Sequence, residues 1–183
     1  MRSPIGYLVA PKNIVNGQIE IYPAGWAIIL RMIDKLIRLV EVLRKHGVRY
    51  LFIGKGAAIF YGYPGTTQDI DIFPKKSEEN CKNLAEALKE LGFDMDKTLE
   101  EGIITGKDFI QIRGGPFPID IVFAPDGIES FDEAEKCKTL IDDRFPCASI
   151  EDIIESKRAA KRQRDKEELP RLEAFMDELK KRK

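Results

Sequence analysis

Three aspartates are the side chains whose spacing most directly suggests chemistry. Asp69 and Asp71 form a D-x-D pair in segment 68–73, where polar and apolar residues alternate as in a half-buried strand. Residues two apart in a strand point to the same face, roughly 6.6 Å apart along the chain, so both carboxylates can reach the same cations. A third acid, Asp120, interrupts the otherwise apolar segment 118–123. If the two strands are neighbours, about 4.8 Å apart, the three carboxylates converge.

Such a cluster is electrostatically costly unless cations bind in it, and oxygen ligands select Mg²⁺ or Mn²⁺ over zinc. Two such ions, roughly 3.5–4 Å apart, would polarise a phosphoryl group and lower the pKa of an attacking hydroxyl. Histidine chemistry is nearly excluded, because the one histidine, His46, precedes Gly47 in a basic segment typical of a helix C-terminus. The three cysteines form no CxxC pair, and we interpret them as buried thiols in a reducing compartment: Cys81, Cys137 and Cys147.

A glycine turn precedes the acids. The apolar segment 48–53 runs into Gly54-Lys55-Gly56 and a short helix, a geometry that presents backbone N–H groups to an anion. Thirteen residues separate Lys55 from Asp69, and the hydroxyls of Thr66 and Thr67 come just before the acids. The turn and the acids together predict a phosphate-binding site.

The sequence contains an internal control for this motif. Asp94 and Asp96 also form a D-x-D pair, but they follow Gly92, which is expected to end a helix. No glycine turn that binds phosphate precedes them, so we interpret this second pair as part of the surface.

The elements that must position the acids alternate between strands and helices. The predicted strands are 48–53, 68–73, 108–113 and 118–123, the last two joined as a hairpin. The predicted helices cover 26–46, 77–91, Ser149 through Lys157 to Arg164, and a last segment that begins near Pro170. This pattern predicts a mixed α/β or α+β sheet.

Three parts are expected along the chain. Residues 1–23 form an N-terminal extension in which Asn16-Gly17 predicts a hairpin, 24–148 form the core, and 149–183 form a helical segment packed on it.

The composition narrows the function classes. The chain has 183 residues, 43% of them hydrophobic, and a net charge of −1, so no global basic field indicates nucleic-acid binding. It contains no apolar run approaching 18 residues and no signal-peptide pattern, which predicts a cytoplasmic protein without a membrane partner. Residues 157–183 carry a local charge of +5, either a solvated helical face or a cationic arm for a phosphate-bearing substrate.

The glycine turn, the thirteen-residue gap and Asp69-Ile70-Asp71-Ile72 resemble the signature of the DNA polymerase β-like nucleotidyltransferase superfamily. The chain is most similar to a small prokaryotic branch that includes minimal nucleotidyltransferases and the nucleotidyltransferase toxins of toxin–antitoxin systems. The resemblance spans about 48–175. Its further matches are Ala57, Gly62, Thr67, the segment Ser149-Ile150-Glu151-Asp152-Ile153-Ile154, Lys157, Arg164-Asp165 and Leu169.

The resemblance implies a nucleotidyltransferase-fold sheet flanked by helices and transfer of a nucleoside monophosphate from an NTP such as ATP. Asp69 and Asp71 would hold two Mg²⁺ or Mn²⁺ ions, and Asp120 would hold the second ion and help deprotonate the acceptor hydroxyl. The expected nucleotide-binding residues are Gly54, Lys55, Thr66, Thr67 and Lys157. The acceptor would be tRNA, a protein or a small molecule, and the toxin-like branch implies an antitoxin partner.

Two other functions use the same residues. Lys55 and Gly65 depart from the family pattern, which has a second small residue and often an arginine there, and they favour a non-catalytic module that binds a nucleotide or a protein. A carboxylate–metal nuclease needs the same acids but leaves the glycine turn unexplained, so it ranks last.

Overall fold

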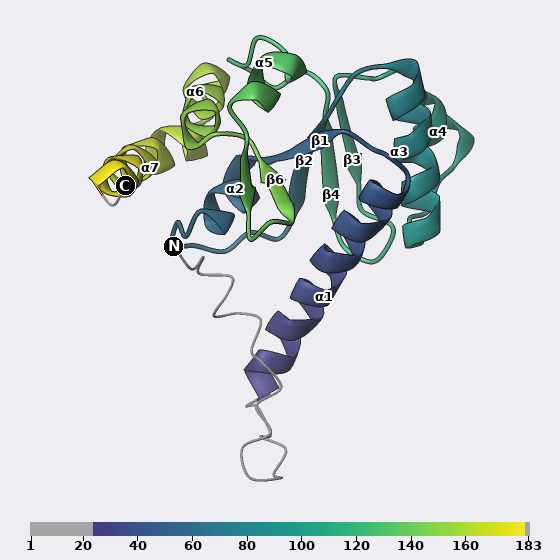
Figure 1. The fold of residues 1–183 in the computed structure, drawn as a ribbon, viewed down its shortest axis with the longest axis horizontal. Helices are drawn as coiled ribbons and strands as arrows, with labels where there is room; N and C mark the ends of the chain where they lie inside the picture. Colours follow the sequence, from purple (N-terminus) through teal and green to yellow (C-terminus); the bar gives the residue numbers. More distant parts are fainter. Residues whose placement is uncertain (1–23, 182–183) are drawn as a thin grey trace.

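A computed structural model describes residues 24–181 of the chain, so the predicted hairpin at Asn16-Gly17 lies outside the described residues. Within that range helices and strands alternate for most of the length (Figure 1). The helices are α1 (Ala24–Lys45), α2 (Gly54–Phe60), α3 (Glu78–Leu91), α4 (Lys97–Ile104), α5 (Phe131–Lys136), α6 (Ile150–Ala160) and α7 (Gln163–Lys181). The strands are β1 (Tyr50–Ile53), β2 (Ile70–Pro74), β3 (Phe109–Ile112), β4 (Ile119–Val122), β5 (Thr139–Ile141) and β6 (Phe145–Cys147).

The strands form one mixed sheet in the order β3-β4-β2-β1-β6-β5. The neighbours β2 and β4 are parallel, as are β1 and β6, whereas the other three pairs are antiparallel. The prediction of an α+β protein with a mixed sheet is therefore confirmed. Helices α3 and α4 lie beyond one end of the sheet, and α6 and α7 lie beyond the other (Figure 1).

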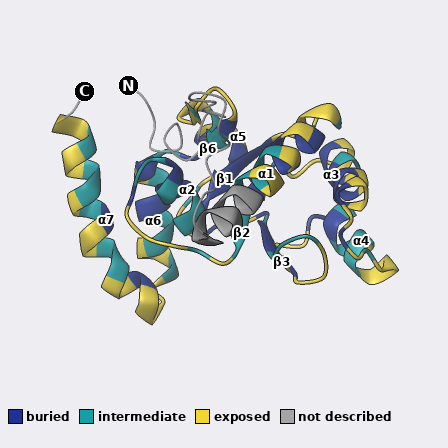
Figure 2. Cartoon of the chain, turned by 90° about the horizontal axis from the view of Figure 1, so that it is seen from below, coloured by how far each residue is buried: buried dark blue, intermediate teal, exposed yellow. Residues whose placement is uncertain are grey.

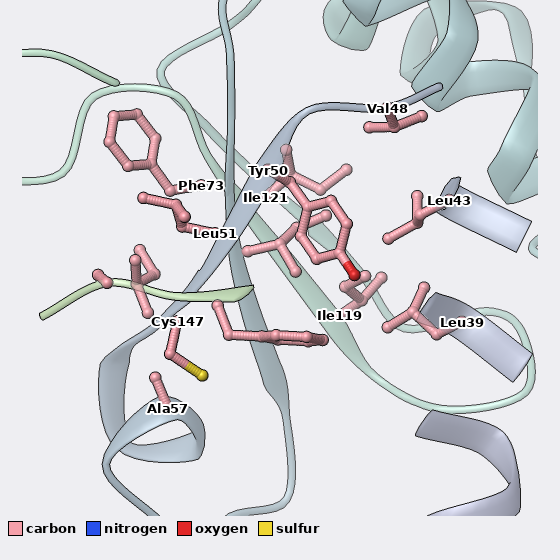
Figure 3. Close-up of a cluster of buried hydrophobic side chains, with 14 of the residues drawn as sticks. Leu39, Leu43, Val48, Tyr50, Leu51, Ala57, Phe73, Ile119, Ile121 and Cys147 are labelled. Carbon is pink, nitrogen blue, oxygen red and sulfur yellow. The ribbon is translucent and has the colours of Figure 1, made fainter. Parts of the chain in front are cut away.

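The core lies around the central strands. All four residues of β1 are buried, and successive side chains such as Tyr50 and Leu51 point to opposite sides of the strand (Figure 3). Ile119 and Ile121 of β4 are completely buried, which is the apolar face that the sequence alternation predicts. Figure 2 shows the same division, with buried residues in the central strands and exposed residues on the outer faces of the helices. The buried central strands therefore form a rigid support for the side chains at their ends.

Several helix ends follow the sequence signals. The side chain of Ser77 accepts a hydrogen bond from the Asn80 amide and begins α3, and Gly92 ends it in the left-handed conformation. Ser149 caps α6 in the same way through the Asp152 amide. The four predicted strands are present, and each begins one or two residues later than predicted; β3 and β4 also end one residue earlier, whereas β2 ends one residue later, at Pro74.

The C-terminal helices correct one prediction. The sequence predicted a helix from Ser149 to Arg164 and a last helix from near Pro170, whereas α6 ends at Ala160 and α7 begins at Gln163. Lys161 adopts a left-handed conformation, with a φ of 54°, that separates the two helices. Pro170 lies inside α7, where it removes one amide donor without ending the helix.

Three further features differ from the sequence prediction or escaped it. Helix α4 was not predicted: it begins where the Asp96 side chain accepts a hydrogen bond from the backbone amide of Leu99. Both acids of the second D-x-D pair are exposed, as predicted. Helix α5 and the β5–β6 hairpin were not predicted at all. Of the cysteines, Cys81 and Cys147 are buried as expected, but Cys137 is exposed because it follows the end of the short helix α5.

None of the helices in the described range is long and apolar enough to cross a membrane.

Candidate active site

The pairing of β2 with β4 brings two of the predicted acids together. These strands run parallel, and Asp71 lies directly opposite Asp120, so both carboxylates project from the same face of the sheet. The expected neighbourhood of the two acidic strands is thus confirmed. Asp69 lies just before β2 rather than inside it. Asp120 is only 7% exposed, which is unusual for an unneutralised acid.

Burial and mutual repulsion act on these acids. The pKa of Asp71 is raised to about 7: burial is the largest cause, the charges of Asp120 and Asp69 also raise it, and Lys157 and Arg164 oppose the shift. Burial also raises the pKa of Asp120, while its contacts with neighbouring polar side chains lower it. The cluster therefore has an excess of negative charge that a cation would relieve.

Two polar residues of the hairpin β3–β4 contact the acids and were not predicted. Gln111 donates hydrogen bonds of 3.3 Å to both carboxylate oxygens of Asp120. The Nη2 atom of Arg113 lies 3.5 Å from Asp120 Oδ1 and 3.6 Å from Asp69 Oδ2. The sequence signal was their alternation with two buried isoleucines, which places both on the face that carries Asp120.

The donor set fits a divalent metal ion in chemistry. All three acids supply oxygen ligands, which suit Mg²⁺ or Mn²⁺. In the described residues, no three acidic, histidine or cysteine side chains lie close enough together to hold a metal as they stand. Arg113 lies between Asp69 and Asp120 instead. A metal ion would have to displace this guanidinium. The ion would then neutralise the carboxylates of Asp69 and Asp120 in place of Arg113.

The glycine turn packs directly on the acids. Gly54, at the start of α2, has a φ of +67°, and a Cβ atom there would lie 2.5 Å from Oδ2 of Asp71. The position therefore needs glycine for two reasons, its left-handed backbone and the close approach of the carboxylate. Thr67 donates from its hydroxyl to the backbone and side-chain oxygens of Asp69, both at 3.1 Å, whereas Thr66 is exposed.

The two departures from the family pattern lie side by side. A Cβ atom on Gly65 would be 3.1 Å from Cε of Lys55, so the lysine side chain fills the space beside the glycine. The ammonium of Lys55 lies 3.0 Å from Oε1 of Glu168 in α7. Lys55 thus adds a cation to the cavity beside the acids, where it is paired with Glu168.

Lys157 holds the two C-terminal helices together. Its Nζ atom lies 3.1 Å from Asp165 Oδ1 and 2.9 Å from Glu168 Oε2, and its side chain is only 13% exposed. Glu168 therefore bridges Lys157 and Lys55, one lysine on each side. This ion network explains why α7 begins before Pro170: the buried Asp165 in its first turn is anchored to α6.

Replacing Lys157 with methionine should destabilise the protein by about 2–4 kcal/mol, because the buried Asp165 loses its ion-pair partner and Glu168 keeps only Lys55. Chemical denaturation measures this change. Lys180→Met is the matched control, since Lys180 pairs with Glu151 on the surface, where both side chains are more than half exposed, and it should change stability by less than about 1 kcal/mol. Equal effects of the two variants would show that the network around Glu168 does not anchor α7.

One cavity of about 900 Å³ contains every site residue predicted from the sequence. Its lining includes Gly54, Lys55, Thr66, Thr67, Asp69, Asp71, Asp120 and Lys157. The wall facing the acids is one side of α7, where Arg164, Glu167, Glu168 and Arg171 recur at helical spacing. Arg162, Arg164 and Arg171 are exposed and form no ion pair within the described residues. The cavity thus has three acids on one side and, on the other, exposed arginines that alternate with Glu167 and Glu168.

Comparison with known proteins adds a general likeness. No family model and no curated protein matches the chain. Among solved structures, it is similar to a crystal structure of a putative nucleotidyltransferase from Thermotoga maritima, with 18% sequence identity and a TM-score of 0.48. The match covers 83% of this chain and 94% of that chain. The geometry of the carboxylates, rather than this likeness, carries the functional conclusion.

Proposed function

We propose that this protein is a metal-dependent nucleotidyltransferase that moves a nucleoside monophosphate from an NTP to a hydroxyl acceptor. The observation that carries the proposal is the direct opposition of Asp71 and Asp120 on parallel strands, with Asp69 beside them and Gly54 packed on Asp71. An open cavity of about 900 Å³ has room for a nucleotide.

In this reaction an oxygen of the acceptor attacks the α-phosphorus of the NTP. A new P–O bond forms, the bond from the α-phosphorus to the bridging oxygen breaks, and pyrophosphate leaves. Mg²⁺ or Mn²⁺ bound by Asp69, Asp71 and Asp120 would neutralise the phosphates and make the acceptor hydroxyl more acidic.

The other residues of the cavity have separate roles. Asp120 would help to deprotonate the acceptor hydroxyl, the role that the sequence resemblance implies for it. Lys55 and the exposed arginines on the α6–α7 side would hold the triphosphate and then the departing pyrophosphate, and Arg164 is close enough to lower the pKa of Asp71. Lys157 contributes positive charge to the same side through its effect on Asp71, although both of its carboxylate partners compete for it.

A transfer assay tests the proposal. The protein is incubated with each of four α-³²P-labelled NTPs, Mg²⁺ or Mn²⁺, and cellular RNA and protein. We expect label on one acceptor class with the intact protein, no label with EDTA, and at least a 100-fold reduction with Asp69→Asn, since removing one charged group at such a site costs rates of this order. Asp94→Asn, in the exposed second D-x-D pair, is the matched control and should retain activity.

A non-catalytic nucleotide-binding module is the second candidate. The observation in its favour is Glu168, which neutralises Lys55 and Lys157 together and so removes cations that would hold a triphosphate. Nucleotide binding by calorimetry without any label transfer, under all metal conditions, would establish this alternative. An antitoxin partner stays a prediction from the sequence resemblance.

A further inference from the structure

Phe109 is an aromatic side chain exposed at the mouth of the proposed active site. It is 49% exposed, whereas every other aromatic residue with a described side chain is buried or half-buried. It forms no ring contact with another aromatic residue in the described range. Among the described residues, Leu140 is the other large apolar side chain that is exposed, at 52%, and it does not line the cavity of the acids. An exposed ring of this kind at a site is a candidate contact for a ligand.

The strand register places Phe109 close to Asp120. Phe109 lies opposite Val122 and Gln111 lies opposite Asp120, so all four side chains project from the face that carries the acids. Phe109 is one strand across and two residues along from Asp120, a separation of about 8 Å between their Cα positions. This separation is comparable with the length of a nucleoside, from its base to its ribose hydroxyl.

The position in the sheet leaves the ring accessible. Strand β3 is an edge of the sheet, so no further strand covers this side. On this side of the cavity the charged residues are engaged in ion pairs: Asp108 lies near Lys76, and Arg113 lies between Asp69 and Asp120. The arginines without an ion pair in the described residues lie on the side formed by α6, α7 and the residues between them. The side with Phe109 therefore offers a ring for a base, and the other side offers unpaired cations for phosphates.

We propose that Phe109 determines which class of acceptor the protein uses, because its ring stacks on an unpaired base of the acceptor. The ribose hydroxyl of that nucleoside unit receives the nucleotide. This inference rests on the proposed function for the direction of transfer. Stacking on an aromatic side chain tolerates any base, because every base has a π-face. The acceptor is accordingly a nucleoside unit, either free or at the single-stranded end of an RNA, and no protein hydroxyl meets this requirement.

A binding experiment tests the stack without requiring catalysis. A fluorescently labelled single-stranded RNA oligonucleotide is titrated with protein, and binding is followed by fluorescence anisotropy. All proteins carry Asp71→Asn, and they differ at position 109: Phe109, Phe109→Ala, Phe109→Leu or Phe109→Trp. We expect Ala and Leu to weaken binding roughly 5- to 100-fold and Trp to retain it, because the ring is needed rather than its apolar area. Leu140→Ala is the matched control, equally exposed but outside the cavity, and should leave binding unchanged.

An oligonucleotide whose terminal residue is abasic separates stacking from charge, since it keeps all the phosphates. It should bind the Phe109 protein as weakly as the intact oligonucleotide binds Phe109→Ala. Competition by a free nucleoside distinguishes the two sources: equal competition assigns the stack to a small nucleoside, and weak competition assigns it to a strand end. Equal binding of abasic and intact oligonucleotides, or no effect of Phe109→Ala, overturns the proposal.

Steady-state kinetics with the acceptor and the NTP separate this inference from the proposed function. In the active protein, Phe109→Ala should raise KM for the acceptor and leave KM for the NTP unchanged. Transfer that is indifferent to Phe109, or label found on protein, refutes the acceptor proposal and leaves the transferase intact. Ring-dependent oligonucleotide binding without any transfer refutes the transferase and leaves the stack.

Discussion

Asp71→Asn should abolish nucleotide transfer and at the same time make the metal-free protein more stable. The loss of activity is expected to be at least 1,000-fold, because the variant removes a charged ligand from the centre of the cluster. The stabilisation follows from the raised pKa of about 7, which burial and the charges of Asp120 and Asp69 impose on this carboxyl in the folded state. An amide at this position carries no charge to bury.

The pH dependence of the effect has a definite sign. The pKa of Asp71 is about 7 when folded and near 4 when unfolded, so the folded state binds the extra proton between these values. The carboxyl then destabilises the wild-type protein increasingly as the pH rises from 4 to 7. In EDTA, the variant should be more stable than wild type by no more than about 1 kcal/mol near pH 4.5 and by about 4 kcal/mol at pH 8, since each unit of pKa difference corresponds to about 1.4 kcal/mol.

Thermal and urea unfolding at both pH values, in EDTA, measure this difference. Asp94→Asn controls for the loss of one surface charge and should show no such pH-dependent gain. A variant that is less stable than wild type at pH 8 would mean that Asp71 is not repelled by its neighbours, and that the acids do not form a cluster that needs a cation.

Gly54→Ala should cost the protein both stability and activity. A φ of +67° already disfavours alanine by about 1–2 kcal/mol. The new Cβ atom would also meet Asp71 Oδ2 at 2.5 Å, so the carboxylate or the turn must move, which adds about 1–3 kcal/mol. The displaced Asp71 should lower transfer at least 100-fold, since a small misplacement of a catalytic group has effects of that size.

Gly47→Ala isolates the two costs. Gly47 has almost the same backbone, with a φ of +66°, but a Cβ atom there meets nothing within 4 Å. It should therefore lose only the conformational part of the stability and keep full activity. If the two alanine variants lose equal stability, a Cβ atom at residue 54 does not clash with Asp71, and the inferred close packing of the turn against this acid is wrong.

The sequence predicted the site residues that are placed by their own strand, and it missed the residues that reach the site through contacts between distant segments. Asp71 and Asp120 were recognisable because each interrupts an alternating strand whose other face is apolar. Gln111 and Arg113 have the same alternation, but on an edge strand polar residues are expected to face water. Their contacts with Asp120 depend on a pairing that no local pattern specifies.

The C-terminal region illustrates the same limit. Lys157, Asp165 and Glu168 belong to a segment rich in both signs of charge, which reads equally well as a solvated face. Their burial against one another is a property of two helices in three dimensions. The β5–β6 hairpin was missed for a different reason: it turns through Asp142 and Asp143, both with positive φ, without the glycine on which the turn signal depends.

The contact between Lys55 and Gly65 makes these two positions an epistatic pair. The lysine fills the space in which any side chain at 65 would begin, so a substitution there has a different fitness effect depending on what residue 55 is. A side chain at 65 would require the flexible end of Lys55 to shift, whereas a smaller residue at 55 would remove this requirement. The effects of substitutions at the two positions are therefore expected to be non-additive, and each position should tolerate different residues depending on the other.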